Sequence, residues 1–281
     1  MELALTASPP RSPLQSLDPR FVLAEAGRAP DDAFPLFEAA IACALDDAGG
    51  RPTAPARAVL EEAVARLKWR LETQDLDDAI AGALAGDLRF SGEVLDYDHL
   101  DNLDVLRVCE RRRGMPVALG LLYLAAARSC DVPLRGVDFP GHFLLRLELD
   151  EGPVALDAFD GARVIMPSEL VRRALHAGLP PGAADRLEDL MRPISDRRVL
   201  IRVQNNILAR AHVAGDHARA ERASLRWALL DPADHRPWLD VATAREAQGR
   251  LTGAVEALGE AQSRGAANAG VARDRLRRRL N

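Results

Sequence analysis

The chain has 281 residues, of which 48% are hydrophobic and 28% are charged. This balance is typical of a globular protein and excludes disorder over the whole chain. The 37 basic and 42 acidic residues give a net charge of -5, which excludes a basic nucleic-acid-binding surface extending over the whole molecule. The length predicts two domains, and the low aromatic content with abundant alanine favours helices.

The three cysteines, Cys43, Cys109 and Cys130, lie far apart and form no CxxC pair. Such a pattern predicts neither a disulfide framework nor a metal site, and it fits a reducing, cytoplasmic setting. The first residues lack the features of a signal peptide, and no apolar run is long enough for a membrane span. The chain also has no Gly-rich phosphate loop and no HExxH zinc motif. We therefore expect a cytoplasmic protein with no metal or cofactor and with neither nucleic acid nor membrane as a partner.

The first half of the chain shows mainly helical patterns. Residues 1–30 are rich in Pro, Ser and Arg, and we expect them to be loosely structured. Helices are predicted over 31–47, 53–71, 75–85, 103–112 and 117–129. The last of these begins after Pro116 and is apolar on nearly all sides, which predicts a central, buried helix.

Alternating apolar and polar residues follow this helix. Strands are predicted over 134–139, 142–149, 154–159 and 163–165. In the second strand Phe143, Leu145 and Leu147 share one face, whereas His142 and Arg146 share the other. Helices followed by an antiparallel sheet predict an α+β domain over residues 31–190.

The chain after Pro180-Pro181-Gly182 is fully helical in pattern and contains an internal repeat. Gly215 and Gly249 are 34 residues apart, as are two pairs of alanines, Ala220 with Ala254 and Ala223 with Ala257. A 34-residue period of paired helices is the signature of tetratricopeptide repeats. An alanine-rich segment can match by chance, but the glycines, the alanines and the Asp231-Pro232 break agree in phase. We predict two such repeats over residues 195–265, supported by the neighbouring domain, and a basic tail over 266–281.

Residues 111–161 carry the most specific motifs of the chain. They include Arg113-Gly114-Met115-Pro116, the block PGHFLLR at 140–146, and Leu156-Asp157-Ala158-Phe159. With Phe90-Ser91-Gly92 upstream, these motifs resemble the SirB-type family of the transglutaminase-like superfamily, which carries C-terminal tetratricopeptide repeats. The resemblance covers about residues 30–265, and it implies a papain/transglutaminase-like fold with helices packed on an antiparallel sheet.

The resemblance also implies the position of a Cys-His-Asp triad. In that arrangement a cysteine begins the buried helix, a histidine on the next strand takes its proton, and an aspartate orients the histidine. His142 and Asp157 match the last two members. The nucleophile position falls within Met115–Ala118, near Ala118, where no residue can attack a carbonyl. Loss of the cysteine there is typical of the SirB-type branch.

None of the chain's own cysteines is a suitable replacement. Cys43 belongs to a separate helix, Cys109 precedes the Gly114 turn, and Cys130 lies at the far end of the buried helix. At that end the helix dipole raises the pKa of a thiol. We expect all three cysteines to be buried structural residues.

Whether His142 and Asp157 meet depends on the hairpin between their strands. A turn at Glu151-Gly152 would offset them by four positions, whereas a turn centred on Leu149-Asp150, or a bulge, would bring them together. We expect a direct contact. The alternative is that each residue only makes local structural bonds.

Three further residues are candidates for binding at this cleft: Arg113, Arg146 and Pro116. The arginine run 111–113 can bind an anion, although such a run is more commonly structural. Arg146 shares a strand face with His142, and Glu148, Asp138 and a ligand carboxylate are its possible partners.

Two functions compete. The first is a non-catalytic module that binds a protein or peptide through the repeats and the remnant cleft. The second is a hydrolase that uses His142 and Asp157 as a general-base pair on an amide or peptide.

Overall fold

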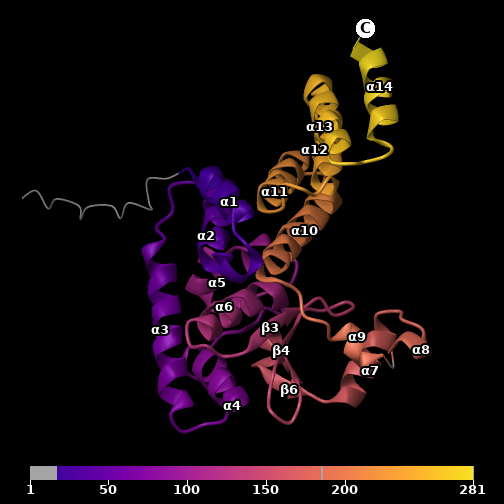
Figure 1. Cartoon of the computed structure of the whole chain (residues 1–281). Coiled ribbons are helices and arrows are strands. Elements are labelled where there is room, and N and C mark those ends of the chain that lie inside the picture. Colours follow the sequence, from indigo (N-terminus) through magenta and orange to yellow (C-terminus); the bar gives the residue numbers. More distant parts are fainter. Residues whose placement is uncertain (1–17, 185, 281) are drawn as a thin grey trace, which may run out of the picture.

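The structure is a computed structural model that describes residues 18–184 and 186–280 (Figure 1). Its first part is helical. The helices are α1 (Pro19–Arg28), α2 (Leu36–Asp47), α3 (Ala54–Leu71), α4 (Leu76–Ala81), α5 (Val105–Arg111) and α6 (Pro116–Arg128). Short turns of helix lie at η2 (Asp31–Ala33), η3 (Gly82–Asp87) and η4 (Leu100–Asn102).

An antiparallel sheet follows α6 in the order β3-β4-β5-β6. The strands are β3 (Leu134–Val137), β4 (Leu144–Leu147), β5 (Val154–Asp157) and β6 (Arg163–Ile165). A separate parallel pair joins β1 (Ser91–Gly92) to β2 (Arg113–Gly114), directly before α6. This order of helices and antiparallel sheet is the α+β arrangement that the sequence predicts.

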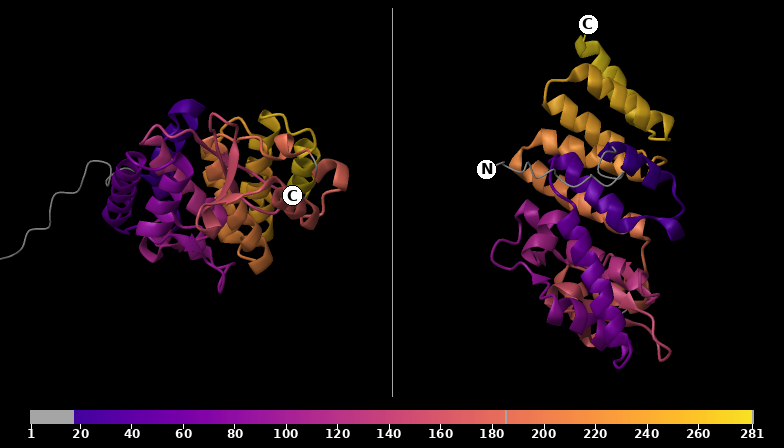
Figure 2. Two further views of the ribbon diagram at one scale, coloured as in Figure 1. Left: turned by 90° about the horizontal axis from the view of Figure 1, so that it is seen from below. Right: turned by 90° about the vertical axis from the view of Figure 1, so that its left-hand side faces the viewer.

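After the sheet, the described part of the chain is mainly helical as far as Leu280. A short η5 (Ala158–Asp160) leads into β6, and α7 (Pro167–His176), α8 (Pro181–Ala184) and α9 (Leu187–Leu190) follow the sheet. The last helices are α10 (Asp196–Ala214), α11 (His217–Leu230), α12 (Arg236–Ala247), α13 (Leu251–Ser263) and α14 (Ala269–Leu280). Figures 1 and 2 show α10 to α14 stacked one after another, leading away from the sheet.

Helix α6 is the centre of the molecule. Pro116 occupies its first turn, where a proline fits without loss of a hydrogen bond. Every residue from Pro116 to Ala127 is buried, as expected for a helix that is apolar on all sides. Phe143, directly before β4, and Leu145 of β4 belong to the same core. Gly120 lets Phe143 approach, because a methyl group there would lie 2.3 Å from the ring.

This main core does not stop at the predicted boundary near residue 190. It also contains Val199 and Leu200 of α10 and Trp227 of α11. A second core on the other sheet face contains Leu144 and residues of α7, and a third holds α12 to α14 together. The first helix pair is therefore packed into the α+β part of the chain.

One expectation about the start of the chain needs correction, and the basic tail has a defined place. Residues 19–28, expected to be loose, form α1, in which Leu23 is fully buried; residues 1–17 lie outside the described part. The basic tail, whose sequence is compatible with a helix, contains α14, in which Leu276 is 1% exposed. In both segments a few apolar residues at helical spacing suffice to bury one face.

The predicted helix pairs are present, with their turns at Gly215 and Gly249. Both glycines have positive φ, +66° and +73°, a conformation that glycine adopts at no steric cost. The alanines that repeat after 34 residues are buried where the helices meet; they are Ala220, Ala223, Ala254 and Ala257. Whether these pairs are tetratricopeptide repeats stays a prediction.

Candidate functional site

His142 and Asp157 are in direct contact. Asp157 ends β5 and is 2% exposed, and its Oδ1 lies 3.0 Å from Nε2 of His142. His142 is not in a strand as predicted, because Gly141 with φ +71° turns the chain and β4 begins only at Leu144. The hairpin pairs Leu147 with Val154, so its turn is centred between Asp150 and Glu151. The turn at Gly141, rather than the hairpin register, therefore brings the histidine onto the carboxylate.

Asp157 is held by two further hydrogen bonds. Nη1 of Arg173 donates to Oδ2 at 2.8 Å, and the backbone N–H of Phe159 donates to Oδ1 at 3.1 Å. Burial opposes ionisation of this carboxyl, but the bonds from His142 and Arg173 outweigh it and hold the Asp157 pKa below its ordinary value. The side chain is thus an ionised, fully engaged acceptor.

Arg173 is fixed from its other side by Glu169. The two side chains are 2.9 Å apart, and Arg163 forms a two-pronged pair with the same carboxylate at 2.7 and 2.9 Å. The hydrogen bond from Arg163, opposed by partial desolvation and helped by Arg173, lowers the Glu169 pKa to about 2. Glu169 and Arg173 belong to α7, which the sequence analysis missed. Its signal was Pro167 in the first turn, followed by apolar residues four apart, Leu170 and Ala174.

Two aromatic rings lie between His142 and the β1–β2 pair that precedes α6. Phe159 meets the imidazole edge to face at 6.2 Å between ring centres, and Tyr97 meets Phe159 at 5.8 Å. Gly92 allows this packing, because a methyl group there would lie 2.5 Å from the Phe159 ring. Since Gly92 pairs with Gly114, Phe159 joins the histidine to the β1–β2 pair that precedes α6.

The start of α6 offers no nucleophile. Met115, Val117 and Ala118 are at most 4% exposed. Ala118 lines an internal pocket with Cys43 and Asp104, and neither His142 nor Asp157 lines that pocket. The position of the lost nucleophile near Ala118 stays a prediction.

The three thiols are also unsuited to attack. Cys43 and Cys109 are buried and Cys130 is half-buried. Burial raises the pKa of Cys43 and of Cys109 to about 12, and it raises the pKa of Cys130 as well.

None of the three predicted binding residues lines the pocket that opens beside His142. Arg113 is exposed and donates to the Gly92 carbonyl at 3.4 Å, and Pro116 is buried in α6. Arg146 pairs with Glu148 at 2.7 Å, one of its predicted partners, and faces the region of Met191. Arg113 and Arg146 are thus bonded to neighbouring acceptors, and Pro116 is covered by the core.

A shallow pocket does open beside His142. Its wall consists of Pro140, Gly141, His142, Arg172, Arg173, His176 and Ala177. Arg172 and His176 make no ion pair with any residue that the structure describes, so the rim of this pocket is basic. Within residues 18–184 and 186–280, no three His, Cys, Asp or Glu side chains are grouped as metal ligands. No helix in the described part is long and apolar enough to cross a membrane.

Comparison with known proteins defines the family. A family profile described as the transglutaminase-like superfamily matches residues 54–205. A UPF0162 protein of Pseudomonas aeruginosa is 30% identical over 206 residues, which are 71% of this chain and 74% of that protein. The chain therefore belongs to the transglutaminase-like superfamily and is a homologue of the UPF0162 proteins.

Other relatives match shorter parts. A UPF0162 protein of Xylella fastidiosa (strain Temecula1) is 33% identical over 172 residues, 61% of this chain and 61% of that protein. F-box only protein 21 of Mus musculus is 44% identical over 94 residues, 34% of this chain and 15% of that protein. The chain thus spans about three fifths of the Temecula1 relative. No solved structure gives a significant match.

Proposed function

We propose that this protein is a non-catalytic, SirB-type member of its superfamily that binds a peptide or protein segment at the His142 face. The observation that carries the proposal is the start of α6, where Met115–Ala118 is buried and holds no nucleophile. Covalent acyl transfer needs a group that attacks the carbonyl. The raised pKa values of the three thiols argue against a replacement. In this proposal the helix pairs after residue 195 act as a tetratricopeptide-like adaptor.

The surface around the pair fits such a partner. Val94 is 72% exposed and Leu95 is 98% exposed, and Tyr97 of the same loop packs on Phe159 beside His142. Exposed apolar side chains with charged neighbours are typical of protein-binding surfaces. With basic Arg172 and His176 at the pocket, the partner segment would carry apolar and acidic side chains.

Site-specific photocrosslinking tests the proposal. A photoreactive phenylalanine analogue at Leu95 should trap a defined partner in native lysate, whereas the same analogue at Trp69, which is 61% exposed on α3, should not. Arg172→Glu should weaken the Leu95 crosslink by repelling an acidic segment. Equal crosslinking from both positions, or none from Leu95, would contradict the proposal.

One observation favours the hydrolase as a second candidate. Nε2 of His142 is held by Asp157, whereas Nδ1 makes no hydrogen bond to the described residues, and the side chain is 20% exposed. A histidine oriented in this way can take a proton from water. If the protein hydrolyses amides, His142→Gln should lower the rate by about 100-fold while iodoacetamide leaves it unchanged. An amide-hydrolysing activity of the purified chain that His142→Gln abolishes would replace the non-catalytic proposal.

A further inference from the structure

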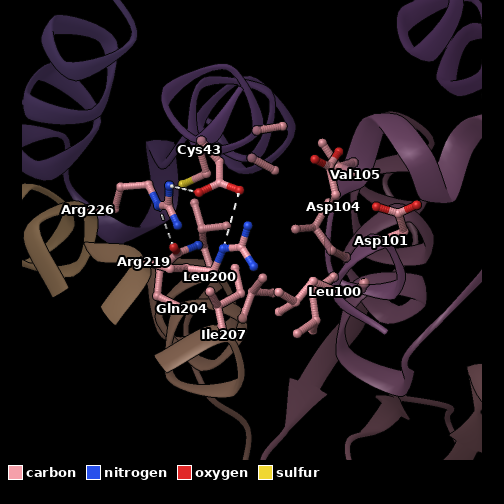
Figure 3. A pocket seen from close by; sticks show the side chains of 17 residues that line it. Cys43, Leu100, Asp101, Asp104, Val105, Leu200, Gln204, Ile207, Arg219 and Arg226 are labelled. Atoms are coloured by element: carbon pink, nitrogen blue, oxygen red, sulfur yellow. Dashed lines mark hydrogen bonds and ion pairs between the residues drawn. The ribbon is translucent and has the colours of Figure 1, made fainter. Parts of the chain in front are cut away.

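We propose that the chain has a second, separate binding site: an internal cavity that takes a small molecule with a carboxylate and a short apolar tail. The cavity lies where the α+β part meets the first helix pair, between α2, α5, α6, α10 and α11 (Figure 3). It is partly enclosed and has a volume of about 100 Å³. For comparison, an apolar cavity of about 150 Å³ holds benzene, so this space suits a ligand of four to six non-hydrogen atoms, roughly.

Two buried donors without partners mark one end of the cavity. Arg226 is 1% exposed; its Nε donates to Oε1 of Gln204 at 2.8 Å, and its Nη1 lies 3.4 Å from Asp46 and from Asp47. Its Nη2 is buried and has no hydrogen-bond partner among the described residues. Gln204 is also 1% exposed, and because its oxygen accepts from Arg226, its Nε2 is a second buried donor left without a partner there.

Two buried N–H donors that lack an acceptor favour the binding of a ligand that supplies one. Leaving a buried donor unsatisfied is costly, and two donors side by side match the two oxygens of a carboxylate. Figure 3 shows Arg226, Gln204 and Arg219 together on one side of the cavity, with Asp101 and Asp104 on the other. Asp104 is already neutralised by Arg51 at 2.7 Å, so it does not oppose an anion at the Arg226 end.

The charged groups around these donors are largely paired with one another. Asp47 lies within 4.0 Å of three arginines on α11, namely Arg219, Arg222 and Arg226. Asp46 adds a pair with Arg20 at 2.8 Å, and Asp216 lies 3.7 Å from Arg219. Counted with Asp101 of the cavity lining and the Arg51–Asp104 pair, five arginines meet five carboxylates, so the two unpartnered donors, and not an excess of charge, favour a carboxylate.

Apart from Arg219 and the aspartates, the rest of the cavity lining is apolar or weakly polar. It includes Leu100, Val105, Leu121, Leu200, Val203 and Ile207. Two convergent donors within a largely apolar lining fit an amphipathic ligand. A short-chain monocarboxylate has this shape: its carboxylate would bond to Arg226 and Gln204, and its tail would lie on the apolar lining.

Titration calorimetry with sodium butyrate at constant ionic strength tests the site. We expect saturable binding of one butyrate per chain, with butyramide and sulfate each binding at least tenfold more weakly. Gln204→Glu keeps the oxygen that accepts from Arg226 but replaces the free donor by a carboxylate oxygen, so it should weaken butyrate at least tenfold. Gln262→Glu, an equal charge change on the exposed side of α13, is the control and should bind like the parent chain.

A second variant covers the case in which Gln204→Glu does not fold. Ala118→Leu adds bulk to the cavity wall without touching either donor, and it should abolish binding while circular dichroism remains unchanged. His142→Gln should leave butyrate binding intact, which separates this site from the proposed peptide surface. The proposal is overturned if butyrate shows no saturable binding, if butyramide binds equally well, or if neither cavity variant changes the affinity.

Discussion

At the scale of single residues, Asp157 has the most demanding environment in the candidate site. It is nearly fully buried, yet it accepts hydrogen bonds from His142, Arg173 and the Phe159 backbone. We expect Asp157→Asn to lower the free energy of unfolding by about 3 kcal/mol at pH 7, because a buried cation loses its counter-charge. Urea unfolding of the two proteins measures this difference, with the exposed Asp150→Asn as the control.

The same substitution has a defined pH dependence. The folded pKa of Asp157 lies below its ordinary value of about 3.9. Its contribution to stability is therefore fully present above pH 4 or so, and it is lost as the pH falls through the lower folded pKa. The difference in unfolding free energy between the parent chain and Asp157→Asn should narrow as the pH falls from about 4 to about 2. A gap that stays constant over this range would mean that the carboxylate charge contributes nothing.

The cysteines give a second residue-scale prediction. Cys43 and Cys109 are covered, with pKa values raised to about 12, and Sγ of Cys130 lies 3.8 Å from the Val64 carbonyl. We expect Ellman's reagent to leave Cys43 and Cys109 unmodified in the native protein and to modify all three thiols after unfolding in guanidinium. Rapid native labelling of either buried thiol would show that its cover opens readily.

At the scale of elements, the packing of α6 on the sheet depends on a glycine, Gly120, where any side chain would collide with a neighbour. A methyl group at Gly120 would lie 2.3 Å from the Phe143 ring. We expect Gly120→Ala to destabilise the protein by about 2 kcal/mol through overpacking. Gly259→Ala on α13, where the nearest atom is 3.8 Å away, should instead stabilise it by about 0.5 kcal/mol through helix propensity. Thermal unfolding of both variants compares them directly, and equal shifts would contradict the packing argument.

At the scale of the whole molecule, α1 packs against the first helix pair, α10 and α11. A methyl carbon at Gly27 would lie 1.9 Å from the Leu229 carbonyl oxygen of α11. Arg197 of α10 reinforces the contact by donating to the Gly27 carbonyl at 3.1 Å and by stacking on Phe34.

Gly27→Ala should therefore force α1 away from α11. We expect a loss of about 3 kcal/mol and faster proteolytic cleavage in the connection between α1 and α2. Gly49→Ala, where the nearest atom is 3.8 Å away, serves as the control. If Gly27→Ala resists protease like the parent chain, the two helices do not depend on this close approach.

The amino-acid sequence by itself determined the features that arise from short-range patterns. The all-apolar run after Pro116 required a buried helix, the alternating residues required an antiparallel sheet, and Gly215 and Gly249 required turns between helices. It also indicated His142 and Asp157 as candidate site residues, because both lie in motifs that resemble those of the transglutaminase-like superfamily. Such signals survive in sequence because helix and strand periodicity and turn chemistry act over a few residues.

Only the tertiary structure decided which of these surfaces meet. The turn at Gly141 places His142 on Asp157, and Arg173 reaches the same carboxylate from α7, whose position no local pattern fixes. Likewise, Arg226 meets Asp46 across 180 positions of the chain, and α1 packs against α11, which is distant in sequence. The physical reason is that long-range contacts depend on the shape and burial of whole faces, whereas sequence periodicity records only which face a residue occupies.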